Sequence, residues 1–257
     1  MSLAWPVLAA LCCGVAWGAA PSYSVTGIVN ASNYAPGPFA PNSILSIFGT
    51  DLAISEHVLT SADIVNNTLP TELNSTRVYV DGINVPLFYV APGQINFLVP
   101  SKQSLGPAVI RVSREGLSGP QVTISIVDAA PALFLAPTGY AIASHNADYS
   151  LVSPDSPAHG GEVVIVWATG MGKTVTNPQT GEIPAYVSSI VNLPELIVTL
   201  NGEPVDSSAV LYAGLSPGCA GLYQINLVLP RDPGMNPEIR VFLGPQSSPT
   251  GLKLAVQ

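Results

Sequence analysis

The stretch YVAPGQINFLVP (residues 89–100) decides the fold of this chain, because it returns in altered form as YQINLVLP (residues 223–230). In both stretches a glutamine and an asparagine alternate with large apolar residues. This period of two is typical of a β-strand that buries one face. The recurrence of such a strand predicts a chain built from two copies of one β-unit.

Three further blocks match in the same order along the chain. They are SILSIFGTDL (43–52) with EVVIVWATGM (162–171), which aligns Phe48 with Trp167, LPTELNSTRVYVDG (69–82) with LPELIVTLNG (193–202), and AVIRV and SGPQVTISI (within 108–126) with EIRVF and SPTGLKLAV (within 238–256). Asp-Gly in VYVDGINVPLFYV (78–90) and Asn-Gly in VTLNGEPV (198–205) predict hairpins. We therefore predict an all-β chain of two tandem immunoglobulin-like β-sandwich domains, at residues 21–129 and 130–257, with about seven short strands each.

The composition favours a β-protein and argues against nucleic acid as a partner. Charged residues make up 9% of the chain, and the formal net charge is −8. Because phosphate binding needs a cationic surface, nucleic acid is not expected as a partner. Together with 47% hydrophobic residues, the 23 glycines and 25 prolines are typical of many short strands joined by tight turns.

The first 20 residues predict a signal peptide. LAWPVLAALCCGVAWGAA (3–20) contains no charged residue and ends in small side chains, as at a cleavage site. Uncleaved, the segment is just long enough to anchor the protein in a membrane. Its removal leaves Cys219 as the one cysteine, so we expect no intramolecular disulfide and interpret Cys219 as a small buried side chain rather than a nucleophile. The predicted location is extracellular or on the cell surface.

Four segments, in this order, carry a resemblance to a known family: NASNYAPGPFAPNSILSIFGTDLA (30–53), VPLFYVAPGQINFLVP (85–100), VVIVWATGMG (163–172) and GLYQINLVLP (221–230). In this set the chain resembles the uncharacterised C-terminal domain family of secreted acidobacterial (Solibacter-type) proteins. The resemblance extends from about Val29 to Gln257. It implies export and an immunoglobulin-like fold, and it transfers no catalytic residue.

Two short motifs invite a catalytic interpretation. ATGMGKT (168–174) ends like a phosphate loop, but the pattern needs a glycine where Trp167 stands, so no nucleotide is expected. GLSPG (214–218) matches the nucleophile-elbow pattern around Ser216, yet an elbow joins a strand to a helix, and a β-run follows here. A secreted hydrolase that uses Ser216 or an unrecognised carboxylate pair stays open as the alternative to a non-enzymatic protein.

The histidines do not predict a metal site. His57, His145 and His159 lack the spacing of metal ligands, and no calcium-loop pattern occurs. We therefore expect neither a metal nor another cofactor. His145, in ASHNADYS (143–150), is expected in a hairpin turn.

Aromatic and amide side chains around the repeated strand are the candidate ligand-binding residues. Alternation places Gln94 and Asn96 opposite Ile95 and Phe97, with the two amides about 7 Å apart along the strand. Exposed aromatic rings beside amides are typical of sugar-binding surfaces on β-sandwiches. The candidates are Tyr89, Gln94, Asn96, Tyr212, Tyr223, Gln224 and Asn226, with Tyr34 nearby in NASNYAPG. The alternative is that the tyrosines are core or turn residues and that the amides fix the adjacent Pro-Gly loop.

Two long loops, residues 51–68 and 170–192, leave equivalent strand ends and are either ligand-contacting loops or flexible surface flaps. Together these features predict a secreted or cell-surface, non-enzymatic protein that acts in adhesion, glycan binding or matrix scaffolding. Its expected partner is an extracellular polysaccharide or a cell-surface protein.

Overall fold

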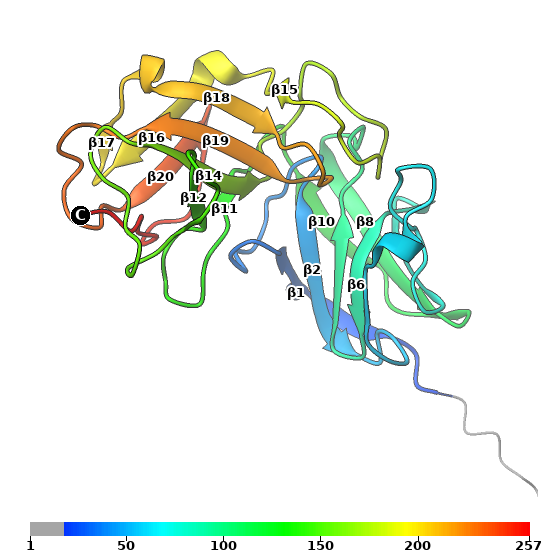
Figure 1. The fold of residues 1–257 in the computed structure, drawn as a ribbon. Coiled ribbons are helices and arrows are strands. Elements are labelled where there is room, and N and C mark those ends of the chain that lie inside the picture. Colours follow the sequence, from blue (N-terminus) through cyan, green and yellow to red (C-terminus); the bar gives the residue numbers. More distant parts are fainter. Residues whose placement is uncertain (1–17) are drawn as a thin grey trace, which may run out of the picture.

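The structure, a computed structural model, describes residues 18–257, so the predicted signal peptide lies almost wholly outside the described residues. The described chain is all-β, and its helical segments are 3-10 turns: η1 (Ser61–Asp63), η2 (Leu193–Glu195) and η3 (Ser207–Ala209). No helix in residues 18–257 is long and apolar enough to cross a membrane. Figure 1 shows two sheet assemblies side by side, the first in blue to cyan-green and the second in green to red.

The first half consists of two antiparallel sheets. Its strands are β1 (Ser22–Asn30), β2 (Ile44–Thr50), β3 (His57–Val58), β4 (Thr76–Val80), β5 (Ile83–Asn84), β6 (Leu87–Ala91), β7 (Gln94–Leu98), β8 (Gly106–Arg114), β9 (Leu117–Ser118) and β10 (Val122–Ile126). One sheet has the order β1-β2-β7-β6-β3. The other has the order β10-β8-β4-β5, with β9 beside β8.

The second half has the same two-sheet organisation. Its strands are β11 (Ala132–Leu133), β12 (Ala143–His145), β13 (Leu151–Val152), β14 (Val163–Thr169), β15 (Ser188–Ser189), β16 (Leu196–Leu200), β17 (Glu203–Pro204), β18 (Val210–Leu215), β19 (Tyr223–Val228), β20 (Ile239–Leu243) and β21 (Gln246–Ser247). One sheet has the order β13-β12-β14-β19-β18-β15, with β11 beside β14, and the other β17-β16-β20-β21.

These strand orders are those of an immunoglobulin-like sandwich, which holds strands A, B, E and D in one sheet and C, F and G in the other. In the first half β1-β2-β7-β6 correspond to A-B-E-D, and β10-β8-β4 to G-F-C. In the second half β12-β14-β19-β18 repeat the first order, and β16-β20 repeat the C-F pair. The predicted all-β, immunoglobulin-like fold class is confirmed.

The register of the central strands is the same in both halves, including one irregularity. Phe48 pairs with Gln94 in the first half as Trp167 pairs with Gln224 in the second. The β6–β7 and β18–β19 ladders each have a bulge, after which Tyr89 pairs with Asn96 and Tyr212 with Asn226. A bulge is a specific feature of a strand pair, because it shifts every residue beyond it by one place. The shared bulge supports the predicted duplication, which stays a prediction.

Two predicted strand segments differ in the structure. LKLAV (252–256) forms isolated bridges instead of a strand. Lys253 bridges to Tyr140 and to Glu238, and Val256 bridges to Ala158. The segment thus contacts several different parts of the second half and does not pair continuously with one strand. In VYVDGINVPLFYV the Asp-Gly turn joins β4 and β5 as expected, but β6 then pairs with β7 in the opposite sheet.

Each half has its own apolar core. The core of the first half draws on residues 23–126, and that of the second on residues 129–256. Ile95 and Phe97 of β7 lie fully buried in the first core, as the alternation predicted, and β19 contributes to the second in the same way. The cores divide close to residue 129, and the domain boundary there stays a prediction.

A third apolar cluster joins the two halves. It consists of Ile44, Leu69 and Leu98 from the first half and Ala220 from the second. Beside it lies the fully buried hydroxyl of Thr169. This hydroxyl donates to Gly221 O (2.8 Å) and accepts the backbone N–H of Ile44 (3.1 Å). One buried side chain therefore satisfies backbone groups on both sides of the contact.

The loop of residues 170–192 lies along the first half. The backbone N–H of Leu69 donates to Gly181 O (2.9 Å), and that of Ile183 donates to Asn67 O (3.0 Å). Figure 1 shows this yellow-green segment beside the first sheet assembly. This part of the loop therefore packs between the halves, a role that the sequence did not indicate.

Gly221 and Gly218 provide a matched test of the contact between the halves. A Cβ at Gly221 would lie 2.5 Å from Leu98 Cδ1 and 2.9 Å from Ile44 Cγ1, whereas a Cβ at Gly218 would meet nothing within 4 Å. Both glycines have positive φ, +76° and +87°, so alanine strains either backbone by roughly 1 kcal/mol. The two sites therefore differ in the steric clash of the added Cβ, which occurs at Gly221 and not at Gly218.

Gly221→Ala is therefore expected to lower the free energy of unfolding by about 2–3 kcal/mol, and Gly218→Ala by about 1 kcal/mol. Urea denaturation of both variants measures this difference. Equal losses would show that the close packing at Gly221 does not stabilise the protein.

Candidate functional site

Hydrogen-bonded amides line the outer face of the sheet β1-β2-β7-β6-β3. Because Ile95 and Phe97 point into the core, Gln94 and Asn96 face outward. The Oδ1 atom of Asn96 accepts hydrogen bonds from Ser46 Oγ (2.7 Å) and Gln94 Nε2 (2.9 Å). Both amides are half-buried. The amide nitrogen of Asn96 and the amide oxygen of Gln94 make no hydrogen bond with another described residue, so both can meet a ligand.

The amides do not fix the Pro-Gly turn, contrary to the structural alternative considered for them. The turn of residues 91–93 is held by backbone groups: Gly49 N–H donates to Gly93 O (3.2 Å), and Leu52 N–H donates to Pro92 O (3.0 Å). Gln94 and Asn96 stand two residues apart on the same face of the strand, so their amides bond to each other and not to the turn.

Tyr34 projects from a tight turn at the end of β1. Its φ is +61°, a left-handed conformation that is rare for a bulky side chain. Three hydrogen bonds hold the turn: Asn30 N–H to Ala35 O (2.8 Å), Tyr34 N–H to Asn30 O (2.9 Å) and Ala35 N–H to Asn33 Oδ1 (3.0 Å). The turn keeps the Tyr34 side chain outside the core, 59% exposed.

Tyr34 and Phe48 form an aromatic pair on this side of the sheet. Their ring centroids lie 5.9 Å apart, with the planes inclined by 53°. Phe48 is 38% exposed and stands opposite Gln94, while the half-buried Tyr89 stands opposite Asn96. We call Tyr34, Phe48, Tyr89, Gln94 and Asn96 the first aromatic–amide face.

The corresponding sheet face of the second half has related chemistry. Trp167 is half-buried, and its indole N–H donates to Ser144 Oγ (3.1 Å). Gln224 Nε2 donates to Asn226 Oδ1 (3.1 Å), as Gln94 does to Asn96. Opposite Asn226 stands Ile165 in place of a serine, so Asn226 Oδ1 receives one hydrogen bond rather than two.

Tyr212 and Tyr223 hold loops. The Tyr212 hydroxyl donates to Leu215 O (2.8 Å) and accepts Ser188 N–H (2.9 Å). Tyr223 is fully buried, and its hydroxyl donates to Gly172 O. The same burial raises the pKa of Tyr223. The structure therefore removes Tyr223 from the candidate set, because a ring buried in the core cannot contact a ligand.

Tyr149 is a further exposed tyrosine, and it is not among the candidates predicted from the sequence. It follows β12 in the hairpin turn predicted around His145, its φ is +61°, and it is 70% exposed. A signal was present: HNADYS (145–150) repeats the pattern of NASNYA (30–35), with Asn or Asp directly before the tyrosine.

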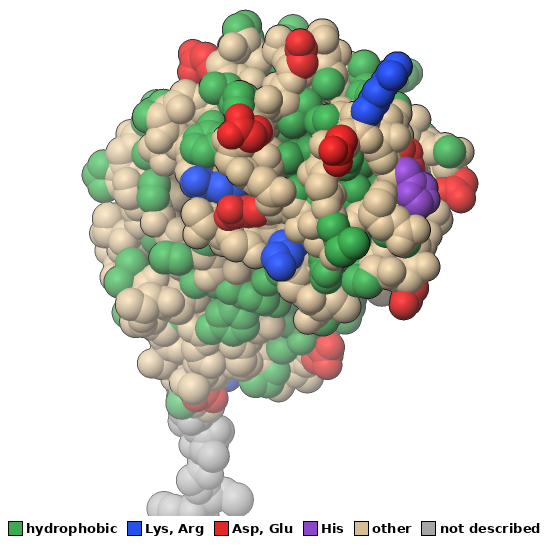
Figure 2. Space-filling view, turned by 90° about the vertical axis from the view of Figure 1, so that its left-hand side faces the viewer, with side chains coloured by type: hydrophobic (Ala, Val, Ile, Leu, Met, Phe, Trp, Pro, Cys, Tyr) green, Lys and Arg blue, Asp and Glu red, His purple; other side chains and the backbone are tan. Residues whose placement is uncertain are grey.

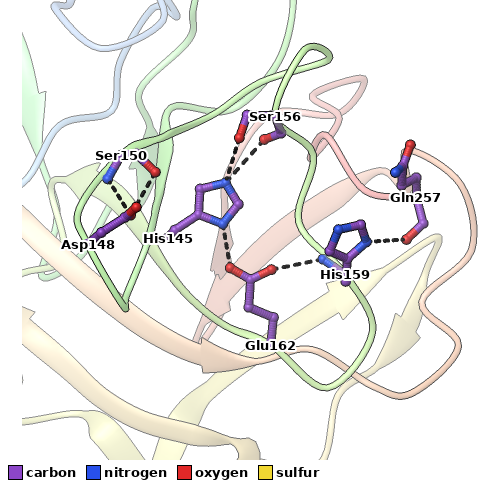
Figure 3. Close-up of polar contacts among 7 residues, drawn as sticks. All are labelled: His145, Asp148, Ser150, Ser156, His159, Glu162 and Gln257. Atoms are coloured by element: carbon purple, nitrogen blue, oxygen red, sulfur yellow. Dashed lines mark hydrogen bonds and ion pairs between the residues drawn. The ribbon is translucent and has the colours of Figure 1, made fainter.

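His145 lies at the centre of a polar cluster next to the Tyr149 turn (Figure 3). Its Nδ1 contacts Glu162 Oε1, and its Nε2 lies 3.2 Å from Ser156 O. The other carboxylate oxygen of Glu162 accepts the backbone N–H of His159 (3.0 Å). The hydrogen bond to Glu162 raises the pKa of His145 above its usual value.

In space, His145 lies between a serine, Ser156, and a carboxylate, Glu162, as the histidine of a hydrolase triad does. Their geometry nevertheless opposes base catalysis. Nε2 of His145 lies 3.2 Å from the Ser156 carbonyl oxygen and 3.4 Å from its Oγ. Both ring nitrogens thus face acceptors, which favours the protonated ring. A general base needs an unprotonated nitrogen facing the serine hydroxyl. We therefore interpret this cluster as structural: it connects the turn after β12 to Glu162 and Ser156.

Ser216 and Cys219 lie in the turn between β18 and β19. Ser216 is 5% exposed, and its Oγ donates to Pro217 O (3.4 Å). A strand rather than a helix follows, so the turn lacks the geometry of a nucleophile elbow. Burial raises the pKa of the Cys219 thiol. Within residues 18–257, no group of three His, Cys, Asp or Glu side chains is placed to hold a metal ion.

Charged side chains are scattered over the face drawn in Figure 2, with more acidic than basic groups. Two arginines are paired with carboxylates: Arg77 contacts Glu72, and Arg114 lies 3.5 Å from Asp51. A surface of this kind offers little attraction to a polyanion.

No protein-family model matches the sequence, and no curated protein matches it either. Among solved structures, the full extracellular region of plexin A4 is similar at 12% identity and a TM-score of 0.30, over 92% of this chain and 18% of that one. SGBP-B from a complex xyloglucan utilization locus in Bacteroides uniformis is similar at 13% identity and a TM-score of 0.24, over 91% of this chain and 49% of that one.

Domains 5–6 of the S-layer protein SbsC are similar at 10% identity and a TM-score of 0.28, over 92% of this chain and 98% of that one. The chain thus spans about a fifth of the plexin A4 structure and about half of SGBP-B. Likeness at these TM-scores carries no argument about function, which therefore rests on the geometry of the site.

Asn96→Ala removes the acceptor of two side-chain hydrogen bonds, whereas Asn226→Ala removes the acceptor of one. We expect the first substitution to lower the free energy of unfolding by about 1–2 kcal/mol and the second by about half as much. Urea denaturation measures both losses. A smaller loss for Asn96→Ala than for Asn226→Ala would contradict the arrangement described above.

The raised pKa of His145 makes the stability of the fold depend on pH. A group whose pKa is higher in the folded state stabilises the fold fully below its unfolded value, here 6.5, and loses this effect as the pH rises through the folded value. His145→Asn is therefore expected to lower the free energy of unfolding by about 1–2 kcal/mol at about pH 5.5, and by less at about pH 8.5. Urea denaturation at both pH values checks this, with His159→Asn as the control. A loss that grew with pH would overturn the assignment.

Proposed function

We propose that this protein is an exported, non-enzymatic polysaccharide-binding protein and that the first aromatic–amide face is its binding surface. The observation that carries the proposal is the exposed Tyr34 ring, held on a left-handed turn beside Phe48. Such a conformation is costly for a bulky residue and persists only where the surrounding structure maintains it. Tyr34 belongs to none of the core clusters, so the turn maintains an exposed ring.

The face offers the two kinds of contact that a sugar ring needs. The C–H faces of a pyranose are apolar and release water when they pack on aromatic rings. Sugar hydroxyls both donate and accept hydrogen bonds, and the free amide groups of Asn96 and Gln94 supply one donor group and one acceptor. The Tyr34 and Phe48 planes are inclined by 53°, which suits successive sugar units whose own planes differ.

Charge and shape favour a neutral polymer. The net charge of −8 disfavours acidic polysaccharides, because like charges repel. The face is the outer surface of a sheet rather than an enclosed pocket. A long polysaccharide can therefore bind there through its internal sugar units as well as through an end.

Several predictions from the sequence belong to this proposal: the signal peptide at residues 1–20, the two domains at 21–129 and 130–257, and membership of the acidobacterial family. The resemblance to secreted proteins supports an extracellular location, where polysaccharides are found. A role in adhesion or in matrix assembly would follow from polysaccharide binding.

Affinity electrophoresis tests the proposal in gels that contain xylan, mannan, mixed-linkage β-glucan or, as an acidic comparison, polygalacturonate. We expect at least one neutral polymer to retard the protein. Tyr34→Ala and Phe48→Ala each remove one stacking surface, so each should weaken binding by roughly tenfold, equivalent to about 1.4 kcal/mol.

Tyr186→Ala is the matched control, because Tyr186 is 84% exposed and lies in the loop 170–192, outside the aromatic–amide face. It should bind as the wild type does. Failure of every neutral polymer to retard the wild type, or unchanged retardation of Tyr34→Ala, would contradict the proposal.

A further inference from the structure

The two halves present an exposed tyrosine on the same turn. Three hydrogen bonds close the first turn: Asn30 N–H to Ala35 O (2.8 Å), Tyr34 N–H to Asn30 O (2.9 Å) and Ala35 N–H to Asn33 Oδ1 (3.0 Å). The three equivalent bonds close the second turn: His145 N–H to Ser150 O, Tyr149 N–H to His145 O and Ser150 N–H to Asp148 Oδ1, each 2.9 Å long. Tyr34 and Tyr149 share a φ of +61°. The turns also start at equivalent register positions, since His145 pairs with Val164 as Asn30 pairs with Leu45.

Packing does not explain why a tyrosine occupies both places. Tyr149 is 70% exposed and belongs to none of the core clusters. A glycine or an asparagine adopts positive φ with less strain than a tyrosine does. Each turn thus keeps, at a conformational cost, a residue that presents an aromatic ring with a polar hydroxyl at its tip.

The sheet behind Tyr149 also carries aromatic and amide groups. Trp167 and Gln224 stand opposite one another on β14 and β19, as Phe48 and Gln94 do on β2 and β7. The second half therefore repeats three elements of the first aromatic–amide face: an exposed ring on a turn, a second ring on the sheet, and an amide pair beside that ring. Among the described residues, the contact between the two rings is recorded for the first half alone.

The base of the second turn differs from that of the first in one respect. Where the first turn has Asn30, the second has His145, whose ring joins the turn to Glu162, directly before β14, and to the Ser156 carbonyl (Figure 3). The other titratable groups around the ring are Asp148, in the turn itself, and His159, which bonds Glu162 through its backbone.

Protonation of His145 changes how firmly the second turn is held. The protonated ring donates to Glu162 and to the Ser156 carbonyl at the same time. The neutral ring has one N–H, so it loses one of these two bonds and gains at best the 3.4 Å contact with Ser156 Oγ. Asn30 does not titrate, so the first turn has no such dependence.

We propose that the Tyr149 turn is a second binding site for neutral polysaccharide, and that protonation of His145 strengthens this site but not the first. The inference rests on the proposed function and extends it. Two sites on one chain bind a long polymer more tightly than either site alone, because the second contact forms at high effective concentration.

Affinity electrophoresis of the full protein at about pH 5.5 and about pH 8.5, on either side of the usual histidine pKa, tests the proposal with xylan, mannan and mixed-linkage β-glucan as probes. The variants are Tyr149→Ala, Tyr149→Phe, Tyr34→Ala and His145→Asn, the last of which places the residue of the first turn in the second. Urea denaturation shows that each variant is folded.

We expect the wild type to bind several-fold more tightly at the lower pH. Tyr149→Ala should bind about tenfold or more weakly at the lower pH and show no pH step, because one contact of two is lost. Tyr149→Phe keeps the ring and should retain the pH step. Tyr34→Ala should retain weak binding that still depends on pH, whereas His145→Asn should bind without a pH step.

The outcomes separate this inference from the proposed function. If no probe retards the wild type, the proposed function fails and the inference fails with it. If Tyr34→Ala abolishes binding while Tyr149→Ala binds as the wild type at both pH values, the first site stands and the second is refuted. If the pH step persists in His145→Asn, the assignment to His145 is refuted.

Discussion

The strand that carries Ile95 and Phe97 has two faces, and the burial of one determines what the other can present. Both apolar side chains fill the core of the first half, so the alternation of the strand turns Gln94 and Asn96 outward. The neighbouring strands are held in register by the same ladder, which brings Phe48 beside Gln94. The candidate surface is thus a consequence of how the core is built.

The second constraint is the contact between the halves. A small apolar cluster, the buried hydroxyl of Thr169 and the close approach of Gly221 fix where the second sandwich meets the first. The loop 170–192 adds backbone hydrogen bonds across the same contact. The turn that bears the exposed tyrosine follows β1 in the first half and β12 in the second. These strands pair with β2 and β14, which in turn pair with the strands that carry the amides.

Much of the fold follows from the sequence, because alternation and turn chemistry are local. The period of two predicted which face of β7 is buried, and the repeated blocks predicted equivalent strand orders. The same alternation places Tyr223 on the inward face with Ile225, so its burial follows from the strand pattern and its nearness to the amides in sequence does not make it a ligand contact. The exposure of Tyr149 does not follow from the sequence, because a tyrosine at positive φ is contrary to propensity. The His145–Glu162 contact joins residues 17 positions apart and depends on strand pairing, so no spacing rule reveals it.

The proposed function requires that the first aromatic–amide face contacts sugar. A crystal structure of the protein with cellohexaose or xylohexaose tests it most directly. We expect a pyranose ring packed on Tyr34 and Phe48, with a hydroxyl bonded to the free amide groups of Gln94 or Asn96. A saccharide bound elsewhere on the molecule, with this face left empty in a crystal where it is open to solvent, would contradict it.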